Sequence, residues 1–254
     1  NCGIASLVND FTGTSNASGQ YPLGTTTVTY TVTDNAGNTA TCTFTVTVTD
    51  NQPPVVNCPS NITVNVDAGV CNANVSVPVV IATDNEGIAS ITNNYNGGGA
   101  NASGNYPVGT TTVTFTATDN TGNTNTCSVD ITVVDNIAPV ITCTSAITVN
   151  ATAGACTASV TIPATTATDN CAVASITNNY NGGGANASGT YPVGTTTVVF
   201  TATDVNGNTS TCSVNVTVVD NQNPTITCPA NISVNVDAAS CVATGASLGT
   251  PVTA

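Results

Sequence analysis

The sequence predicts an all-β protein made of tandem sandwich repeats of about 85 residues, and three observations carry this prediction. A T-x-T-C motif followed by an alternating segment recurs three times, so that Cys42, Cys127 and Cys212 stand 85 residues apart. Thr or Ser alternates with Val, Ile or Phe in short runs, which is the pattern of half-buried strands. The 254 residues include no Lys, Arg, His, Met or Trp, and the Thr, Val, Asn and Gly that dominate favour strands and turns.

Proline-containing links mark the expected repeat boundaries, because proline removes a ladder donor and stiffens a connection. They occur at residues 51–54, 136–139 and 221–224. They divide the chain into a first, partial repeat (1–51, the later part), a complete second repeat (52–136), a complete third repeat (137–221) and a fourth, partial repeat (222–254, the earlier part). Either the sequence is a window on a longer array, which we favour at this stage, or the broken halves complete each other between neighbouring molecules, as in strand-donated fibres.

Each complete repeat is expected to contain about seven short strands. In the second repeat the alternating segments are 62–66, 74–77, 88–93, 110–118 and 127–134. Glycine-containing turns separate them at 67–69, 97–99 and 120–122. Seven strands in about 85 residues are what an immunoglobulin-like sandwich requires. The only large core candidates are aromatic residues such as Tyr30, Phe115 and Phe200, so we expect disulfides to supplement a small core.

Charge excludes some partners and favours others. Thirteen acidic residues and no basic ones give a formal net charge of −13. Nucleic acid is excluded as a partner because phosphate binding requires Lys or Arg, whereas cations are natural partners. No apolar run approaches the roughly 18 residues of a membrane-spanning helix. The start at Asn1 and Cys2 lacks the features of a signal peptide, which indicates a mature or internal fragment.

Eleven cysteines recur at repeating positions without any His and without a C-x-x-C pair. This pattern indicates a disulfide framework in an oxidising compartment and disfavours a zinc site. Because the count is odd, at least one cysteine has no partner within these 254 residues.

Several motifs occur in the same order in both complete repeats. They are NCPSNITVNVDAG, a TDN turn, and YPVGTTTVTFTATDNTGNTNTCSVDITVVDN, as written in the second repeat. This series resembles the hyalin repeat (HYR), an immunoglobulin-like extracellular module, over the whole chain. Similar repeats occur in animal matrix proteins and in very large bacterial surface adhesins. The resemblance therefore implies an extracellular or cell-surface location, a linear array or filament of repeats, and spacing or adhesion as the role.

The resemblance also implies that the first and last cysteines of each repeat pair, giving Cys58–Cys127 and Cys143–Cys212. The second repeat departs from the four-cysteine form of the pattern, because Glu86 stands where the third repeat has Cys171. Cys71 is thereby left without a partner in its own repeat.

Two pairings remain open for the second and third cysteines. The expected topology places Cys71 where the chain leaves one sandwich and Cys171 where it enters the next, so a Cys71–Cys171 clasp between consecutive repeats is one expectation. The alternative is a Cys156–Cys171 bond within the third repeat, made possible by a kink at Pro163, with Cys71 reduced.

Acidic residues recur at three stations: DN dipeptides at the links, TDN turns, and T-x-T-D turns that end in GN. In an immunoglobulin-like sandwich these stations converge near each link, and carboxylate and amide oxygens are the ligands that Ca²⁺ takes in sets of six to eight. The candidate ligands are Asp34, Asp50, Asn51, Asp84, Asp119, Asp135, Asn136, Asp169, Asp204 and Asp220. The alternative is that these residues only build Asx turns.

The sequence predicts no enzyme. No His base is available to a Ser or Cys nucleophile, and the repeated carboxylates lack an aromatic-lined cleft. The leading function is a structural repeat region of an extracellular fibre, stalk or large adhesin that spaces or links a distal element, with neighbouring repeats or identical subunits as partners. The alternative is an adhesive module that binds surface glycans or proteins. The segment ITNNYNGGGANASG is identical at 91–104 and 176–189, which disfavours the alternative because binding loops are expected to vary.

Overall fold

The fold is all-β, as the sequence predicts. The computed structural model describes residues 3–236, 238 and 247–253, and every regular element in these ranges is a strand. The chain divides into two compact units, residues 1–135 and 136–254. Each is described by itself below.

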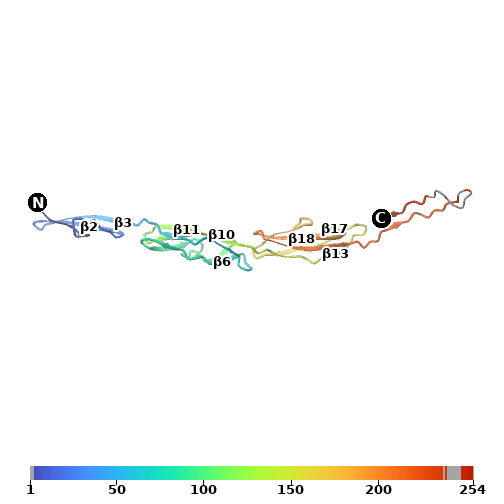
Figure 1. The fold of residues 1–254 in the computed structure, drawn as a ribbon, viewed down its shortest axis with the longest axis horizontal. Coiled ribbons are helices and arrows are strands. Elements are labelled where there is room, and N and C mark those ends of the chain that lie inside the picture. The colour runs from blue at the N-terminus through green and yellow to red at the C-terminus, as the bar shows by residue number, and fades with distance from the viewer. Residues whose placement is uncertain (1–2, 237, 239–246, 254) are drawn as a thin grey trace. The chain divides into compact units, whose positions relative to one another are not determined.

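The first repeat is a single antiparallel sheet. Its strands are β1 (Ile4–Asn9), β2 (Gly24–Asp34) and β3 (Thr39–Val48), with β2 in the centre (Figure 1). The β2–β3 turn places Gly37 at a φ of 87°, a backbone conformation that glycine adopts without a Cβ penalty. One layer of strands is therefore present here, and its inner face has no second sheet packed on it within residues 3–51.

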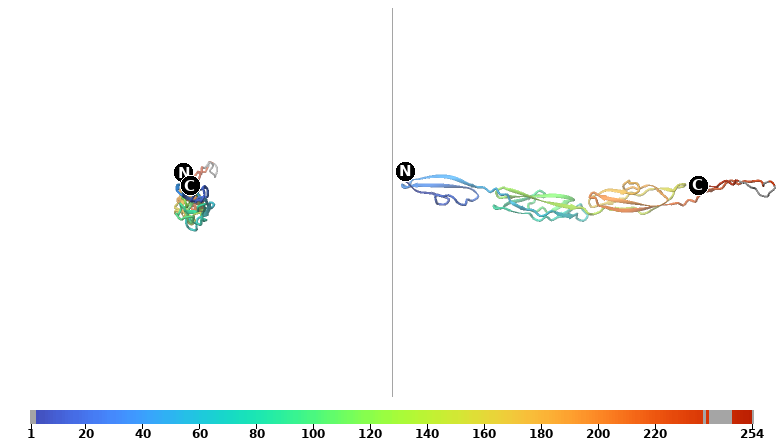
Figure 2. Two further views of the ribbon diagram at one scale, coloured as in Figure 1. Left: turned by 90° about the vertical axis from the view of Figure 1, so that its left-hand side faces the viewer. Right: turned by 45° about the horizontal axis from the view of Figure 1, so that its top comes forward.

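The second repeat is a complete sandwich of short and long strands. They are β4 (Val55–Asn57), β5 (Ile62–Asn65), β6 (Asn72–Val75), β7 (Ile81–Thr83), β8 (Ile88–Asn93), β9 (Gly104–Pro107), β10 (Gly109–Asp119) and β11 (Thr124–Val134). The main sheet has the order β5-β11-β10-β8, in which β5 runs parallel to β11. The pairs β4–β7 and β6–β9 form the other layer (Figure 2). The repeat has eight strands where about seven were expected, since the segment before Gly109 forms a strand of its own.

Alternation along the long strands creates the core of the second repeat. Val113 and Phe115 of β10 and Val129 and Ile131 of β11 are fully buried, while Thr114 and Asp130 between them are partly exposed. Tyr106 is also fully buried, and its hydroxyl donates to the Ala102 carbonyl oxygen at 2.6 Å, which satisfies the polar end of an otherwise apolar side chain.

The third repeat copies the second within the second unit. Its strands are β12 (Val140–Thr142), β13 (Ile147–Asn150), β14 (Thr157–Val160), β15 (Thr166–Thr168), β16 (Val173–Asn178), β17 (Gly189–Pro192), β18 (Gly194–Asp204) and β19 (Thr209–Val219). The sheet order β13-β19-β18-β16 and the parallel β13–β19 pair repeat the arrangement above. Beyond it lie two short paired strands, β20 (Ile226–Thr227) and β21 (Val252–Thr253).

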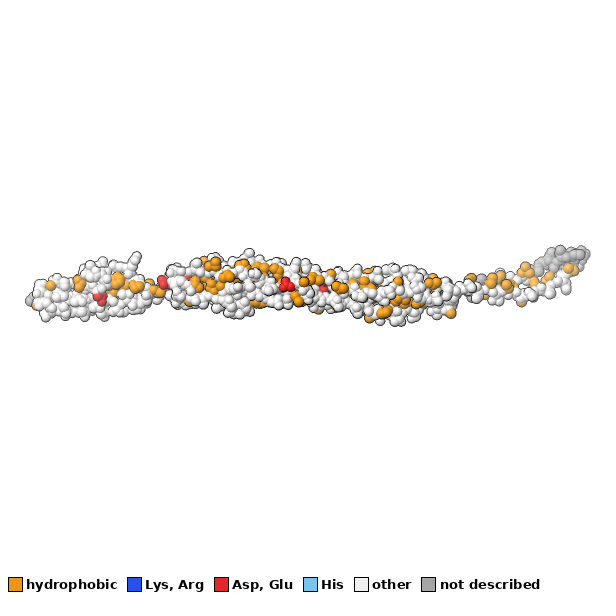
Figure 3. Space-filling view, turned by 90° about the horizontal axis from the view of Figure 1, so that it is seen from below, with side chains coloured by type: hydrophobic (Ala, Val, Ile, Leu, Met, Phe, Trp, Pro, Cys, Tyr) orange, Lys and Arg blue, Asp and Glu red, His pale blue; other side chains and the backbone are white. Residues whose placement is uncertain are grey.

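Most of the visible surface in Figure 3 is neither hydrophobic nor charged side chain, but backbone and other side chains. Outward-facing threonines pair across the long strands, as Thr110 and Thr132 do with 3.0 Å between their hydroxyl oxygens. In the described part of the chain, no helix has the length and apolarity that a membrane span requires.

Candidate metal centre

Three carboxylates meet at the start of the second repeat. Asp50 lies in the link before β4, Asp84 follows β7, and Asp119 ends β10. One carboxylate oxygen from each lies within 4.8 Å of the other two. These are the three stations that the sequence predicts to converge, and the Asp50–Asp84–Asp119 cluster lies entirely within the first unit.

Asp119 is buried and held by the turn that follows it. Its side chain is 1 % exposed. Its Oδ1 accepts the backbone N–H groups of Thr121 at 2.9 Å and Asn123 at 2.8 Å, and its Oδ2 accepts the Asn123 side-chain amide at 2.8 Å. Gly122, at a φ of 98°, allows the tight turn that brings these donors together.

The same hydrogen bonds keep Asp119 ionised. Burial raises the pKa of the Asp119 carboxyl, but hydrogen bonds from the Asn123 side chain, the Thr121 hydroxyl and the two backbone N–H groups outweigh it. The net pKa therefore lies below the ordinary Asp value of 3.8. At neutral pH the buried carboxyl is an anion.

Asp50 and Asp84 each accept the backbone N–H of the residue two positions further along the chain. Asp50 Oδ1 accepts the Gln52 backbone N–H at 3.0 Å, and Asp84 Oδ1 accepts the Glu86 backbone N–H at 3.0 Å. The Thr121 hydroxyl lies 3.3 Å from Asp50 Oδ2 and 2.9 Å from Asp119 Oδ1. Thr121 thus connects the link to the turn that follows β10.

The donor set suits a hard cation. Three carboxylates carry up to six oxygens, and Ca²⁺ takes six to eight oxygen ligands from carboxylates, carbonyls and water. Like charges this close repel one another, and the chain has no Lys, Arg or His to neutralise them. The residues present therefore fit a Ca²⁺ ion held by Asp50, Asp84 and Asp119.

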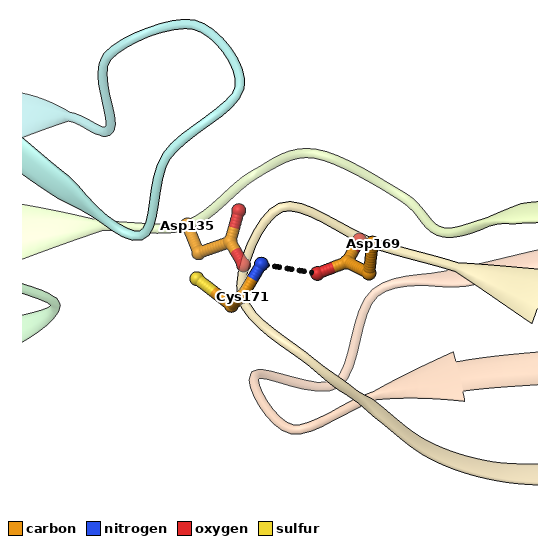
Figure 4. A group of neighbouring side chains, drawn as sticks. All are labelled: Asp135, Asp169 and Cys171. Atoms are coloured by element: carbon orange, nitrogen blue, oxygen red, sulfur yellow. Dashed lines mark hydrogen bonds between the residues drawn. The ribbon is translucent and has the colours of Figure 1, made fainter.

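In the second unit, the equivalent residues show the same local chemistry. Asp169 Oδ2 accepts the Cys171 backbone N–H at 2.8 Å (Figure 4). Asp169 Oδ1 is buried and has no hydrogen-bond partner among the described residues. Asp204 is 2 % exposed and accepts hydrogen bonds from the backbone N–H and the side chain of Asn208. Asp135 is buried at the end of the first unit.

The remaining predicted ligands are not members of the Asp50–Asp84–Asp119 cluster. Asp34 accepts the Asn38 side-chain amide at 3.0 Å in the first repeat, and Asp220 accepts the Gln222 backbone N–H at 3.0 Å. Asn51 and Asn136 are exposed. Sequence reasoning did not single out Thr121 and Asn123, although the GN that closes each T-x-T-D turn was the available signal for Asn123.

Two disulfides staple the complete repeats. Cys58 is bonded to Cys127 and Cys143 to Cys212, each with a sequence separation of 69. These are the pairings that the resemblance implies.

Among the cysteines that the structure describes, three exposed thiols are free, namely Cys42, Cys156 and Cys228. The alternative Cys156–Cys171 pairing is therefore wrong for this structure. The Cys71–Cys171 clasp stays a prediction that non-reducing peptide mapping tests.

Acid is expected to destabilise the complete repeats through Asp119 and Asp204, whose pKa values are both lowered in the fold. A carboxyl with a depressed folded-state pKa contributes stability that is full above its unfolded pKa and is lost as the pH falls through its folded pKa. In chelator, the melting temperature should therefore decrease once the pH drops below about 4, which is near the unfolded Asp pKa. Asn123→Ala removes a hydrogen-bond donor to Asp119, so the second repeat of this variant should begin to lose stability at a higher pH.

The control for this pH experiment is Asn105→Thr, because Thr190 occupies the equivalent position of the third repeat. An acid transition of the second repeat that is the same in Asn123→Ala and in the control would contradict the assignment.

The fold and the site define a class: tandem β-sandwich repeats, the two complete ones each with an internal disulfide, with carboxylates gathered at the start of a repeat. The HYR domain model matches residues 2–48, 49–133 and 134–218. The chain belongs to the HYR domain family. This is an extracellular, adhesion-type repeat family and not an enzyme family. The second matched segment contains all three residues of the Asp50–Asp84–Asp119 cluster.

Two curated relatives are proteins named hyalin. The chain is 38 % identical over 207 residues to hyalin of Strongylocentrotus purpuratus, covering 79 % of this chain and 17 % of that protein. It is 36 % identical over 207 residues to hyalin of Lytechinus variegatus, covering 79 % of this chain and 38 % of that protein. The chain thus spans less than half the length of either relative.

Solved structures similar to the chain include cadherin fragments. Mouse cadherin-23 EC22-24 has a TM-score of 0.34 at 15 % identity and covers 76 % of this chain and 74 % of that one. Drosophila N-cadherin EC1-3 has a TM-score of 0.32 at 17 % identity and covers 79 % of each chain. At these TM-scores the likeness supports no functional argument.

Proposed function

We propose that this chain is a structural repeat region of an extracellular fibre, stalk or large surface adhesin, and that Ca²⁺ bound by Asp50, Asp84 and Asp119 stiffens the start of the second repeat. The observation that carries the calcium proposal is the convergence of three carboxylates in a chain without a single basic side chain. The structural role is supported by the repetition of one sandwich, with its disulfide, in two consecutive repeats.

Calcium would act by bridging segments that are far apart in sequence. Asp50 belongs to the link, Asp84 to the turn after β7 and Asp119 to the turn after β10. Without a cation, the connections among these segments include the Thr121 contact described above and a 3.3 Å hydrogen bond from the Asn123 side-chain amide to the Asp50 carbonyl oxygen. The Asn120 side-chain amide also donates to the Glu86 carbonyl oxygen at 2.6 Å. A divalent ion replaces repulsion among the carboxylates with attraction to a shared charge. The link then loses freedom relative to β7 and β10.

Calcium is expected to raise the melting temperature of the second repeat at pH 7. Binding to the folded state alone stabilises by RT ln(1 + [Ca²⁺]/Kd), which is about 1.4 kcal/mol when free Ca²⁺ is tenfold above Kd. Asp84→Asn should abolish this gain. In chelator the same variant should be at least as stable as the parent chain, since it removes one of three repelling charges while retaining the oxygen that accepts the Glu86 N–H. Calorimetric melting with CaCl₂ and with EDTA measures both effects.

Asp130→Asn is the matched control for Asp84→Asn. Asp130 lies on the outer face of β11, where its Oδ1 accepts the Thr112 hydroxyl at 2.7 Å. Asn215 occupies the equivalent position in the third repeat and accepts the same hydrogen bond from Thr197. Asp130→Asn should therefore keep the full calcium response. If the melting curves of the parent chain coincide in CaCl₂ and EDTA, the calcium proposal is wrong and the acidic residues only form Asx turns.

A further inference from the structure

One surface loop occurs twice with the same sequence and the same hydrogen bonds. It joins β8 to β9 in the second repeat and β16 to β17 in the third. Residues 94–103 are identical to residues 179–188, and each copy contains an Asn-Gly-Gly sequence, which begins at Asn96 and at Asn181. Both asparagines and the two glycines that follow each of them are exposed.

A buried asparagine anchors this loop. Asn93 is 7 % exposed. Its Oδ1 accepts the backbone N–H groups of Tyr95 and Asn96, each at 3.0 Å. Its Nδ2 donates to the carbonyl oxygens of Gly99 at 2.9 Å and Asn101 at 3.2 Å. The third repeat has the same four hydrogen bonds. The residues on both sides of the exposed glycines are therefore held in place by the folded sandwich.

The Asn96 side chain folds back over the glycines that follow it. Its Oδ1 accepts the Gly98 backbone N–H at 2.9 Å, and its Nδ2 lies 3.4 Å from the Asn101 carbonyl oxygen. A Cβ added to Gly98 would lie 2.8 Å from Oδ1 and 3.3 Å from Cγ of Asn96. In the third repeat, Asn181 Oδ1 accepts the Gly183 N–H at 2.9 Å. In both loops the amide carbon thus lies against the backbone that follows it.

An asparagine in this position can react with its own main chain. The backbone nitrogen of the next residue attacks the side-chain amide carbon, and glycine is the residue that hinders this attack least because it has no side chain. Negative charge develops on the amide oxygen as the new bond forms. A fixed N–H donor at about 2.7–3.1 Å from such an oxygen stabilises that charge. The Gly98 N–H is a donor of this kind for Asn96 Oδ1.

We propose that Asn96 and Asn181 are sites of spontaneous deamidation through a succinimide, promoted by the N–H groups of Gly98 and Gly183. In the second repeat, the Gly97 nitrogen gives up its proton to hydroxide and forms a bond to Asn96 Cγ. The Cγ–Nδ2 bond breaks, and ammonia leaves with a proton from water. Water then opens the ring at either carbonyl carbon, which leaves aspartate or isoaspartate. One water is consumed and one ammonia is released for each event, with no oxidation or reduction.

This modification goes beyond the proposed function and does not depend on calcium. Each event converts a neutral amide into a carboxylate and makes the net charge of −13 more negative by one. The isoaspartate product also reroutes the main chain through the former side chain, at a point between the anchored halves of the loop.

A third Asn-Gly pair provides an internal comparison. Asn206 and Gly207 lie in the turn after β18, and both are exposed. The N–H two residues beyond Asn206 belongs to Asn208, and it donates to Asp204 Oδ1 at 2.8 Å. The Asn206 amide oxygen therefore lacks the donor that the Asn96 amide oxygen has. We expect Asn206 to deamidate more slowly in the folded chain, although its local sequence is also Asn-Gly.

The test incubates the 254-residue chain in EDTA at neutral and mildly alkaline pH, with and without urea, followed by chymotryptic peptide mapping and fragmentation that distinguishes isoaspartate from aspartate. In the folded chain, Asn96 and Asn181 should convert at similar rates, at least severalfold faster than Asn206, and should give isoaspartate as well as aspartate. All rates should rise with pH, because the deprotonated backbone nitrogen attacks. In urea the three rates should converge, because the donors are no longer held in place.

Gly98→Ala tests the donor while leaving the Asn96-Gly97 pair intact. The new Cβ would meet Asn96 Oδ1 at 2.8 Å, so the amide must move away from the N–H. Gly98 does not have a positive φ, so alanine fits its backbone conformation. The rate at Asn96 should fall severalfold in the folded variant and stay close to the parent rate in urea. Asn181 in the same molecule is the matched control and should react at the parent rate.

Three results would overturn the proposal. The first is a folded chain in which Asn96 and Asn181 react no faster than Asn206. The second is aspartate without isoaspartate, which indicates direct hydrolysis of the amide. The third is an unchanged rate at Asn96 in folded Gly98→Ala, with folding checked by its melting temperature. Because EDTA is present throughout, none of these results bears on the calcium proposal.

Discussion

Replacing both Cys58 and Cys127 with Ser is expected to lower the free energy of unfolding of the second repeat by roughly 4 kcal/mol. The disulfide closes a segment with a sequence separation of 69, and the chain-entropy model assigns a loop of this length a stabilisation of that size through the unfolded state. The repeat has few large buried side chains to compensate, since its fully buried aromatics are Tyr106 and Phe115. Calorimetry of the whole chain in EDTA measures the loss as a shift of one transition.

The third repeat provides the internal reference for this experiment, because it keeps the Cys143–Cys212 bond. Its transition should not move. Cys156→Ser, which removes a free exposed thiol, should leave both transitions unchanged. A loss below about 1 kcal/mol in the double variant would mean that packing alone maintains the second repeat.

Phe115→Ala is expected to cost the second repeat about 3–5 kcal/mol, the usual range for deleting a buried phenyl group and leaving a cavity. Phe115 is fully buried between the two layers. Tyr30 occupies the equivalent position of the first repeat but is only half-buried. Tyr30→Ala should therefore cost considerably less in the monomeric chain.

A Cys42→Ser/Cys228→Ser background removes two free, exposed thiols and is the appropriate parent for this comparison. Phe200→Ala, at the equivalent buried position of the third repeat, should reproduce the loss in that repeat alone. Equal costs for Tyr30→Ala and Phe115→Ala would show that the β1–β3 sheet is already covered by a second layer.

Most of the strand architecture could be predicted from the sequence because side-chain direction in a strand has a period of two. The expected strand at 88–93 coincides with β8, and the expected strands at 110–118 and 127–134 form the longer β10 and β11. The short strands were harder to place. β6 covers Asn72–Val75 where 74–77 was expected, because its length is set by pairing with β9 and not by its own pattern.

The sequence could predict the three kinds of turn that supply the carboxylates of the candidate site. It could not predict which acidic residues meet there. Repetition at a spacing of 85 pointed to Asp50, Asp84 and Asp119, but the same reasoning included Asp34, Asn51 and Asn136. Whether carboxylates meet depends on which turns lie at the same end of a sandwich. Asp34 forms the same turn hydrogen bonds as Asp119, and the positions equivalent to Asp50 and Asp84 would lie before residue 1.

By itself, the sequence determined the all-β class, the repeat, the alternation that separates core from surface, and the chemistry of the acidic turns. These properties follow from local geometry and from residue types that recur at a fixed spacing. Only the tertiary structure decided that Cys156 remains a free thiol, that Thr121 lies between Asp50 and Asp119, and that Phe44 is exposed while Val129 at the equivalent position is buried. The physical reason is that each of these depends on what another segment, distant in sequence, packs against or leaves uncovered.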